Sequence, residues 1–259
     1  MTLSNYQYSW NGFTFGAGTP YIVEEVDGLV TTAPLRVQDD NRGYIDGTLS
    51  GRDFYDARTI TFKLLIIGDS SHNAQYYFYQ LKQNIVPQTL GYPSSLGLLQ
   101  FALPGWTGNL QILGRIRNVE SVIDPEWAIG YIPVTVEIYC PDPRYYDDTA
   151  VVGTASTVGV ANNGWATTCP TIYIASPSSS FILTAIAAGT TIATMNFQNV
   201  TTSSDVTIDL LNRTITQGGV AARNIMQYST GWLYAPAGLT TNFTINTGTM
   251  QVTYRSAYI

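Results

Sequence analysis

The sequence is poor in charged residues. Only 12% of its 259 residues are Asp, Glu, Lys or Arg, against roughly 25% in soluble domains in general. Apolar residues make up 45% of the chain, a normal share for a globular protein, which excludes disorder as the default state. A surface with so little charge is typical of a protein that other subunits cover.

Histidine and cysteine are almost absent. One histidine, His72, and two cysteines, Cys140 and Cys169, leave few ways to build a catalytic triad or a zinc site. The spacing of the cysteines matches no metal or redox motif, and we expect both to be buried free thiols. The sequence contains no phosphate-binding loop, metalloprotease motif or nucleophile elbow. We therefore expect no enzymatic activity, no cofactor and no metal site.

Long apolar runs are also missing. No stretch approaches the roughly 20 apolar residues that cross a bilayer. The first residues lack the basic and then apolar order of a secretory signal. We therefore expect no membrane association.

Paired acids occur, but not in a catalytic arrangement. Glu24-Glu25, Asp39-Asp40 and Asp147-Asp148 are neighbours in sequence, and neighbouring residues of a strand point to opposite faces. The two carboxyl groups of a glycosidase must instead flank a sugar from about 5–10 Å apart. These pairs are more typical of solvated loops.

Charge and composition divide the chain into two parts. Residues 1–149 hold 16 of the 18 acids and nine of the 12 bases, a net charge of −7, and residues 150–259 carry +1. After Pro141-Asp142-Pro143, whose prolines end a strand, the composition shifts to Thr, Ser, Ala and Gly. We predict an N-terminal domain over residues 1–148 and a C-terminal domain over residues 149–259. Neither part has the basic stripe of a nucleic-acid-binding protein.

Most of the first part has the patterns of strands. Residues 1–20 predict a strand or hairpin at the start of a sheet, or else an arm that reaches onto a neighbouring subunit. The runs on either side of Pro104–Asn109 predict a hairpin. Thr59–Leu64 alternates with period two, and so does Ile132–Cys140, where Pro133 predicts an edge strand or a strand start. A single helix is predicted over about 70–86, because Ala74, Phe78, Leu81 and Ile85 form one apolar stripe between a polar cap and Pro87.

The second part predicts a β-sandwich, because short strand patterns recur between turns. The predicted strands are Thr171–Ala175, Phe181–Ala185, Thr190–Phe197, Asp205–Leu210, Thr214–Gln217, Met226–Tyr228, Phe243–Asn246 and Met250–Arg255.

Several short segments together resemble a known family. NGFTFG at 11–16, VDGL at 26–29, ARTITF at 57–62, CPDPRYY at 140–146, DLLNRTITQGG at 209–219 and the terminal VTYRSAYI are similar, in order and spacing, to the distal tail proteins of long non-contractile-tailed (siphovirus-like) bacteriophages. The resemblance implies a mainly β fold, with an N-terminal ring-forming β domain that has one helix and a C-terminal galectin-like β-sandwich.

The resemblance also implies a function. Members of this family form a homohexameric ring at the virion tail tip, after synthesis in the host bacterial cytoplasm. The ring joins the tail tube protein to the tail-tip hub or receptor-binding proteins. Its channel passes DNA without binding it specifically, and an acidic N-terminal domain agrees with that role because it repels phosphates.

The stretch Tyr21–Ile67 contains the expected subunit interface. Its middle part, Val37–Ala57, has many turn and charged residues but few core positions, and a long segment of that kind in a compact domain is usually functional. Opposite charges along it would set register and partner choice. The expected interface residues are Arg42, Arg52, Arg58, Asp39, Asp40 and Asp46.

Two other functions stay open at this point. The chain could be a tail-tube subunit that carries an added sandwich domain. It could also be a carbohydrate-binding module or adhesin, in which an exposed Trp165 or Trp232 would stack on sugar rings.

Overall fold

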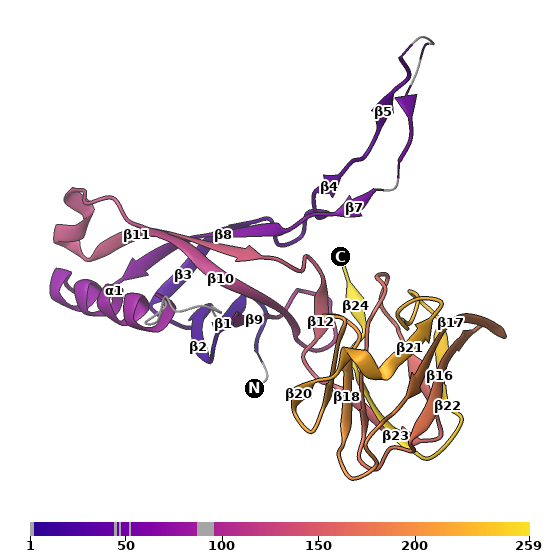
Figure 1. Cartoon of the computed structure of the whole chain (residues 1–259). Helices are drawn as coiled ribbons and strands as arrows, with labels where there is room; N and C mark the ends of the chain where they lie inside the picture. The colour runs from indigo at the N-terminus through magenta and orange to yellow at the C-terminus, as the bar shows by residue number, and fades with distance from the viewer. Residues whose placement is uncertain (1–2, 44–45, 47, 52, 87–95) are drawn as a thin grey trace. The chain divides into compact units, whose positions relative to one another are not determined.

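The computed structural model describes residues 3–43, 46, 48–51, 53–86 and 96–259. The chain separates into two compact units, Met1–Tyr145 with Ile259 (unit 1) and Tyr146–Tyr258 (unit 2). The sequence places the domain boundary slightly later, after residue 148. The mainly β fold class with one α-helix is confirmed for the described residues (Figure 1).

Unit 1 is built on antiparallel strands in the order β2-β1-β9-β10-β11-β8-β3. The bounds are β1 (Gln7–Trp10), β2 (Phe13–Gly16), β3 (Tyr21–Asp27), β8 (Arg58–Ile67), β9 (Gly97–Phe101), β10 (Leu110–Glu120) and β11 (Tyr131–Cys140).

Strand β10 pairs with β9 and with β11 along different parts of its length. Leu110–Gly114 pairs with β9 and Arg115–Glu120 pairs with β11. The change falls at Gly114, where a Cβ atom would lie 2.8 Å from Cγ2 of Ile138 and 2.9 Å from Sγ of Cys140. Only glycine fits such a close approach without displacing its neighbours.

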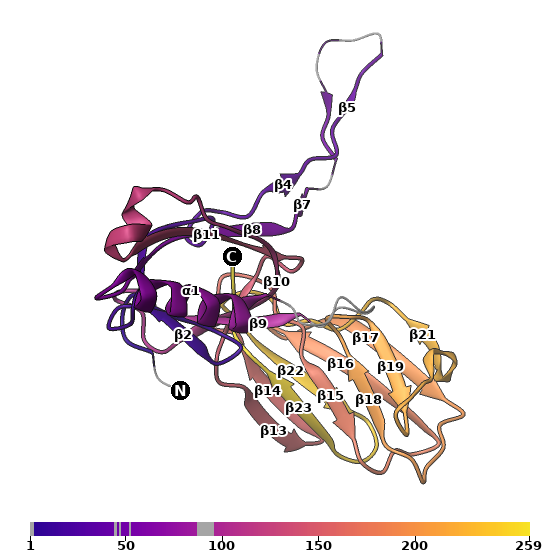
Figure 2. The ribbon, with the colours of Figure 1, turned by 90° about the vertical axis from the view of Figure 1, so that its left-hand side faces the viewer.

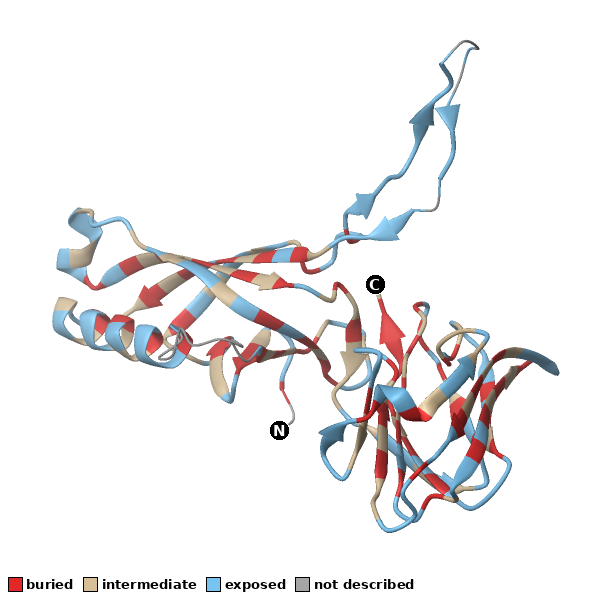
Figure 3. Cartoon of the chain, in the orientation of Figure 1, coloured by how far each residue is buried: buried red, intermediate tan, exposed pale blue. Residues whose placement is uncertain are grey.

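The strands that precede Gly114 in the strand order, β2 and β1, pack against β8 across one core. Phe62 of β8 packs edge-to-face against Tyr8 of β1, with ring centroids 5.0 Å apart, and against Phe15 of β2, with centroids 5.2 Å apart. Alternate residues of β8 and β11 are buried in this core (Figure 3). The period-two patterns in the sequence therefore follow from burial of one face of each strand.

Helix α1 (Ser71–Ile85) covers part of this core. Its buried residues are those of the predicted stripe, Ala74, Phe78, Leu81 and Ile85, and the side chain of Ser70 caps its first turn. The helix packs on β8 and β11 (Figure 2). A short 3₁₀ helix, η1 (Pro125–Ile129), lies in the connection between β10 and β11.

Strand β11 is not the edge strand that Pro133 predicted. It pairs with β8 along its whole length and with β10 from Thr135 to Tyr139. The ladder to β10 begins at Thr135, just after Pro133, so the proline costs no hydrogen bond in that ladder. The alternative prediction, that Pro133 lies near the start of a strand, is correct.

Between β3 and β8 the chain forms a hairpin, residues 34–56, which we call the arm (Figure 1). Its paired segments are β4 (Leu35–Arg36) with β7 (Phe54–Tyr55) and β5 (Asp40–Asn41) with β6 (Thr48–Leu49). The described residues between these pairs have no ladder. The arm is thus a thin two-stranded element.

Unit 2 is a sandwich of two antiparallel sheets, β13-β23-β15-β18-β19-β20 and β14-β22-β16-β17-β21. Phe181 and Phe197 stack in its core, with ring centroids 4.6 Å apart. The bounds are β13 (Val151–Ala155), β14 (Thr157–Ala161), β15 (Thr171–Ile174), β16 (Ser180–Ala187), β17 (Thr190–Gln198), β18 (Val206–Asp209), β19 (Thr214–Gln217), β20 (Val220–Ala221), β21 (Met226–Ser229), β22 (Thr240–Ile245) and β23 (Met250–Tyr254). The remaining elements are η2 (Arg223–Ile225), β24 (Ala257–Tyr258) and β12 (Tyr145–Asp147), which contains the division between the units.

Candidate assembly surfaces

The arm has no interior. Every described residue from 34 to 56 is exposed (Figure 3), including the apolar Leu35, Val37, Leu49, Phe54 and Tyr55, whose exposed fractions run from 39% to 55%. An isolated two-stranded hairpin is marginally stable at best in water. Several exposed apolar side chains on one thin hairpin are typical of an interaction surface.

Four of the expected interface residues lie on the arm. Asp39, Asp40, Arg42 and Asp46 are all exposed. Asp39 accepts a hydrogen bond from the backbone N–H of Gly51 across the hairpin, at 3.1 Å. The fifth, Arg52, lies outside the described residues. The arm therefore presents mixed charge beside its apolar side chains.

Arg58, the sixth expected interface residue, is in the interior of unit 1 and only 2% exposed. Its Nη1 donates to the carbonyl oxygens of Gly28 at 2.9 Å, Leu29 at 3.3 Å and Thr31 at 2.9 Å. The guanidinium lies 4.4 Å from the ring centroid of Tyr145, and Nη1 also contacts the hydroxyl of Tyr145.

The expectation for Arg58 was therefore wrong, because its side chain faces the root of the arm rather than a neighbour. The hydroxyl of Tyr145 donates to the carbonyl of Leu29, so one tyrosine and one arginine hold the same loop. Burial raises the pKa of Tyr145, although the charge of Arg58 opposes the rise. A tyrosine in this setting stays protonated and keeps its hydrogen bond.

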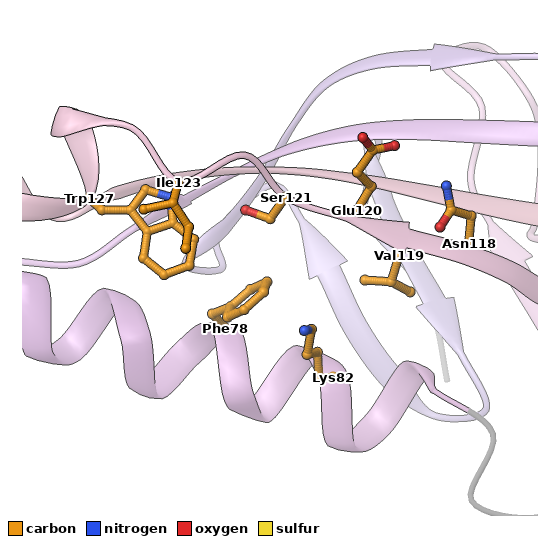
Figure 4. A pocket seen from close by; sticks show the side chains of 8 residues that line it. All are labelled: Phe78, Lys82, Asn118, Val119, Glu120, Ser121, Ile123 and Trp127. Carbon is orange, nitrogen blue, oxygen red and sulfur yellow. The ribbon is translucent and has the colours of Figure 1, made fainter.

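A groove of about 370 Å³ lies between α1, the end of β10 and the residues around η1 (Figure 4). Phe78 and Trp127 meet edge-to-face in it, with ring centroids 5.4 Å apart. The ammonium of Lys82 lies 4.6 Å from the Phe78 centroid. Val119 and Ile123 also line the groove, and Ile123 is 80% exposed. The groove is thus lined by four apolar side chains together with Lys82, Asn118, Glu120 and Ser121.

Two arginines lie near this groove on β10. The guanidinium carbons of Arg115 and Arg117 are 5.3 Å and 3.5 Å from the ring centroid of Tyr139 on β11. Sequence analysis missed both as interface candidates. The sequence does not show that both arginines lie beyond the ladder to β9, which ends at Gly114 in the described part of the chain.

The two tryptophans proposed for sugar stacking have different surroundings in unit 2. Trp165 is 58% exposed and meets Tyr258 edge-to-face, with ring centroids 4.9 Å apart. Trp232 packs against the core, and the guanidinium of Arg223 lies 4.5 Å from its ring centroid. Of the two, Trp165 offers the more open ring.

Reactive side chains do not gather into a site in the part of the chain that the structure describes. No group of His, Cys, Asp and Glu there could hold a metal ion. His72 is exposed in the first turn of α1. Cys140 and Cys169 form no disulfide with a described residue, and Cys140 is buried as expected whereas Cys169 is only half-buried. Burial raises the pKa of the Cys140 thiol to about 12. No described helix is long and apolar enough to cross a membrane.

Comparison with known proteins gives a result at the level of the fold. No protein-family model and no curated protein matches the sequence. The crystal structure of Dit from phage SPP1, described as a paradigm of the hub adsorption apparatus in phages that infect Gram-positive bacteria, is similar with a TM-score of 0.70 and 15% identity. The similarity covers 98% of this chain and 99% of that one. This chain has the Dit fold.

Chains in two structures of the phage P2 baseplate in its activated conformation are also similar. The structure with Ca gives a TM-score of 0.52 at 9% identity, and the one with Sr gives 0.52 at 10%. Both matches cover 98% of this chain and 99% of the other. The resemblance to phage distal tail proteins seen in the sequence is thereby confirmed in the fold.

Proposed function

We propose that this chain is a structural protein of a phage tail tip. It forms a homohexameric ring that joins the tail tube to the host-recognition baseplate and leaves a channel for DNA. The observation that carries the proposal is the similarity to SPP1 Dit over almost the whole length of both chains. In this role the protein belongs to the virion tail and acts without catalysis.

Unit 1 has the kinds of surface that a ring requires. A ring closes through a head-to-tail interface, in which two different patches of each subunit meet. The exposed apolar arm and the groove beside β10 lie at different places on unit 1 and have different shapes. Asp39, Asp40, Arg42 and Asp46 would give the arm its register on a neighbour.

The net charge of the N-terminal part of the chain supports the proposed DNA channel. The net charge of residues 1–149 is −7. An acidic wall repels the phosphates of DNA and so lets the molecule pass without gripping it. The partners in this proposal are the tail tube protein on one side of the ring and the tail-tip hub or receptor-binding proteins on the other.

Native mass spectrometry and negative-stain electron microscopy of the purified chain test the proposal. We expect a closed ring of six copies, either alone or after mixing with the tail tube protein of the same phage. Open-ended tubes would favour a tail-tube subunit instead. A monomer that never closes with the tube protein and binds glycans would favour the carbohydrate-binding module, and loss of glycan binding in Trp165→Ala would locate that site.

A further inference from the structure

Two arginines of β10 lie beside one aromatic ring on the surface of unit 1. The guanidinium carbon of Arg117 is 3.5 Å from the ring centroid of Tyr139, and that of Arg115 is 5.3 Å from the same centroid. Both arginines are exposed and Tyr139 is half-buried. Ile138 and Cys140, on either side of Tyr139 in β11, are buried. The arginines and the tyrosine therefore lie on the face of the sheet that points away from the core.

No second layer of unit 1 covers this face in the described part of the chain. Helix α1 packs on β8 and β11 from the core side (Figure 2), and β1 and β2 pack against Phe62 of β8 on that side as well. On the face that carries the arginines, Thr59 and Lys63 of β8 and Glu120 of β10 are exposed. A ligand in solution can therefore reach the two guanidinium groups.

A bulge in β10 separates Arg117 from the nearest acid of β11. Ile116 lies opposite Ile138, but Asn118 lies opposite Glu137, so Arg117 is the extra residue of the bulge. In a regular ladder Arg117 would be directly opposite Glu137, and cross-strand pairs of opposite charge stabilise a sheet. Bulges re-aim side chains, often next to functional sites. Here the bulge forgoes the ion pair, and the guanidinium lies over the aromatic ring instead.

The two arginines have no acidic partner of their own. Neither forms an ion pair with a residue that the structure describes. Two guanidinium groups beside one ring repel each other, and stacking on the ring holds them there in spite of the repulsion. Stacking uses the planar face of a guanidinium and leaves its N–H edge able to donate hydrogen bonds. An anion that accepts from both groups would remove the repulsion.

The backbone of DNA has the chemistry that this pair of arginines suits. A guanidinium donates two parallel hydrogen bonds to the oxygens of one phosphate. Because phosphates recur regularly along a strand, two neighbouring arginines can contact the same backbone without reading its sequence. Two contacts are few, and residues 1–149 carry a net charge of −7, so the binding is expected to be weak. A weak contact of this kind agrees with DNA that must move past the protein.

We propose that Arg115, Arg117 and Tyr139 form a binding site for the sugar–phosphate backbone of DNA. The arginines bind the phosphates, and the ring of Tyr139 positions them. The site goes beyond the proposed function, in which the acidic wall of the channel only repels DNA. The identity of the ligand rests on that proposed channel, which brings DNA to this chain, whereas the site itself rests on the geometry of β10 and β11.

Fluorescence anisotropy of a labelled DNA duplex of about 20 base pairs, titrated with the full chain at several salt concentrations, tests the site. Arg115→Gln with Arg117→Gln should weaken binding about tenfold or more at low salt. The slope of log affinity against log salt should become shallower by about 2, because each phosphate contact contributes about 0.9. The matched control is Arg213→Gln with Arg223→Gln, which removes two exposed arginines of unit 2, one of them stacked on Trp232. It should keep the affinity and the slope of the original chain.

Two neighbouring positions separate a built site from loose surface charge. Tyr139→Leu keeps both arginines but removes the ring, and it should weaken binding about threefold or more, whereas Tyr139→Phe should rescue it. Glu137→Gln removes a nearby carboxylate and should strengthen binding. Circular dichroism checks the fold of each variant. If the arginine variant does not fold, the changes at Tyr139 and Glu137 still decide, and a Tyr139→Leu chain that binds like the original would refute the positioning role.

Competition identifies the anion. Unlabelled duplex should displace the probe, whereas inorganic phosphate and polyglutamate, each at the same concentration of anionic groups and the same ionic strength, should displace it far less. Displacement by phosphate as effective as that by duplex would assign the site to free phosphate. Equal displacement by polyglutamate would assign it to an acidic peptide. Either result would overturn the assignment to DNA.

Native mass spectrometry of the same samples keeps this inference apart from the proposed function. Rings that bind no DNA, or that bind it equally well without the two arginines, overturn the site and leave the proposed function in place. Binding that depends on the arginines, in a chain that forms no ring even with the tube protein, overturns the proposed function and leaves the site in place. A chain that forms no ring and binds no DNA overturns both.

Discussion

Replacing Arg58 by methionine should loosen the root of the arm. The guanidinium donates to three carbonyl oxygens of residues 28–31 and contacts the hydroxyl of Tyr145. Methionine fills a similar volume but donates no hydrogen bond. The loop that leads into the arm then depends on Tyr145 alone.

Two opposing effects set the size of the change. All four contacts are made by Nη1, whose two N–H groups form two full hydrogen bonds at a time. At about 3 kcal/mol each for a charged donor, losing them costs about 6 kcal/mol of stabilisation. Against this, Nε and Nη2 of Arg58 are buried and have no partner among the described residues, and removing them relieves about 3 kcal/mol. We expect the free energy of unfolding of unit 1 to fall by about 3 kcal/mol.

Urea denaturation followed by hydrogen exchange measures both parts of this prediction. The midpoint for unit 1 should fall, and the amides of residues 28–33 should exchange faster than in the original chain. Arg42→Met on the exposed arm is the matched control and should change stability by less than about 0.5 kcal/mol. An Arg58→Met chain with unchanged stability and exchange would show that desolvation of the buried charge cancels its hydrogen bonds.

Three further predictions concern other parts of the chain. Arg42→Glu should weaken ring formation, measured by native mass spectrometry, and leave the fold intact, measured by circular dichroism. The control variant, Arg213→Glu on an exposed turn of unit 2, should assemble normally. Equal assembly of both variants would show that Arg42 is not in the interface. Leu81→Ala should lower the free energy of unfolding by about 2–5 kcal/mol, because Leu81 is fully buried on α1, and a loss below about 1 kcal/mol would contradict that packing. Cys140 should resist thiol reagents in the folded protein, and rapid labelling in the native state would refute this. Burial raises the pKa of Cys140 above the ordinary thiol value of 9.0, so the thiol ionises first in the unfolded chain. The free energy of unfolding should therefore fall as pH rises above about 9 and through about 12.

The elements that the sequence predicts well are those with a local pattern. The stripe of α1 repeats at helical spacing, and β8 and β11 alternate with period two, so one buried face was enough to identify them. Strands β13 and β14 were missed because VVGTA and TVGVA contain small residues that depress a strand pattern. Gly153 shows why they are small, since a Cβ atom there would lie 2.6 Å from Cγ1 of Val158.

The sequence could predict only those features of the candidate interface that depend on neighbouring residues in the chain. Asp39, Asp40 and Arg42 could be placed on an exposed hairpin, because turn residues and scarce core positions are properties of the segment itself. The sequence could not separate Arg58 from them. Its hydrogen-bond partners come from residues 28–31 and from Tyr145, 87 positions away, and only the folded chain brings these groups together.

The charged residues of β3 and β10 also depend on the folded structure for their interpretation. Glu24 and Glu25 read as a solvated pair, and Arg115 and Arg117 as polar positions of a hairpin. Their meaning depends on which strands end the sheet, and that follows from the corner at Gly114 and from the connection that carries the arm out of β3. Once the strand order is known, Glu24, Glu25 and Asp27 lie on β3, the last strand of the order. Arg115 and Arg117 lie beyond the ladder to β9, on a segment of β10 that also contains the exposed Glu120.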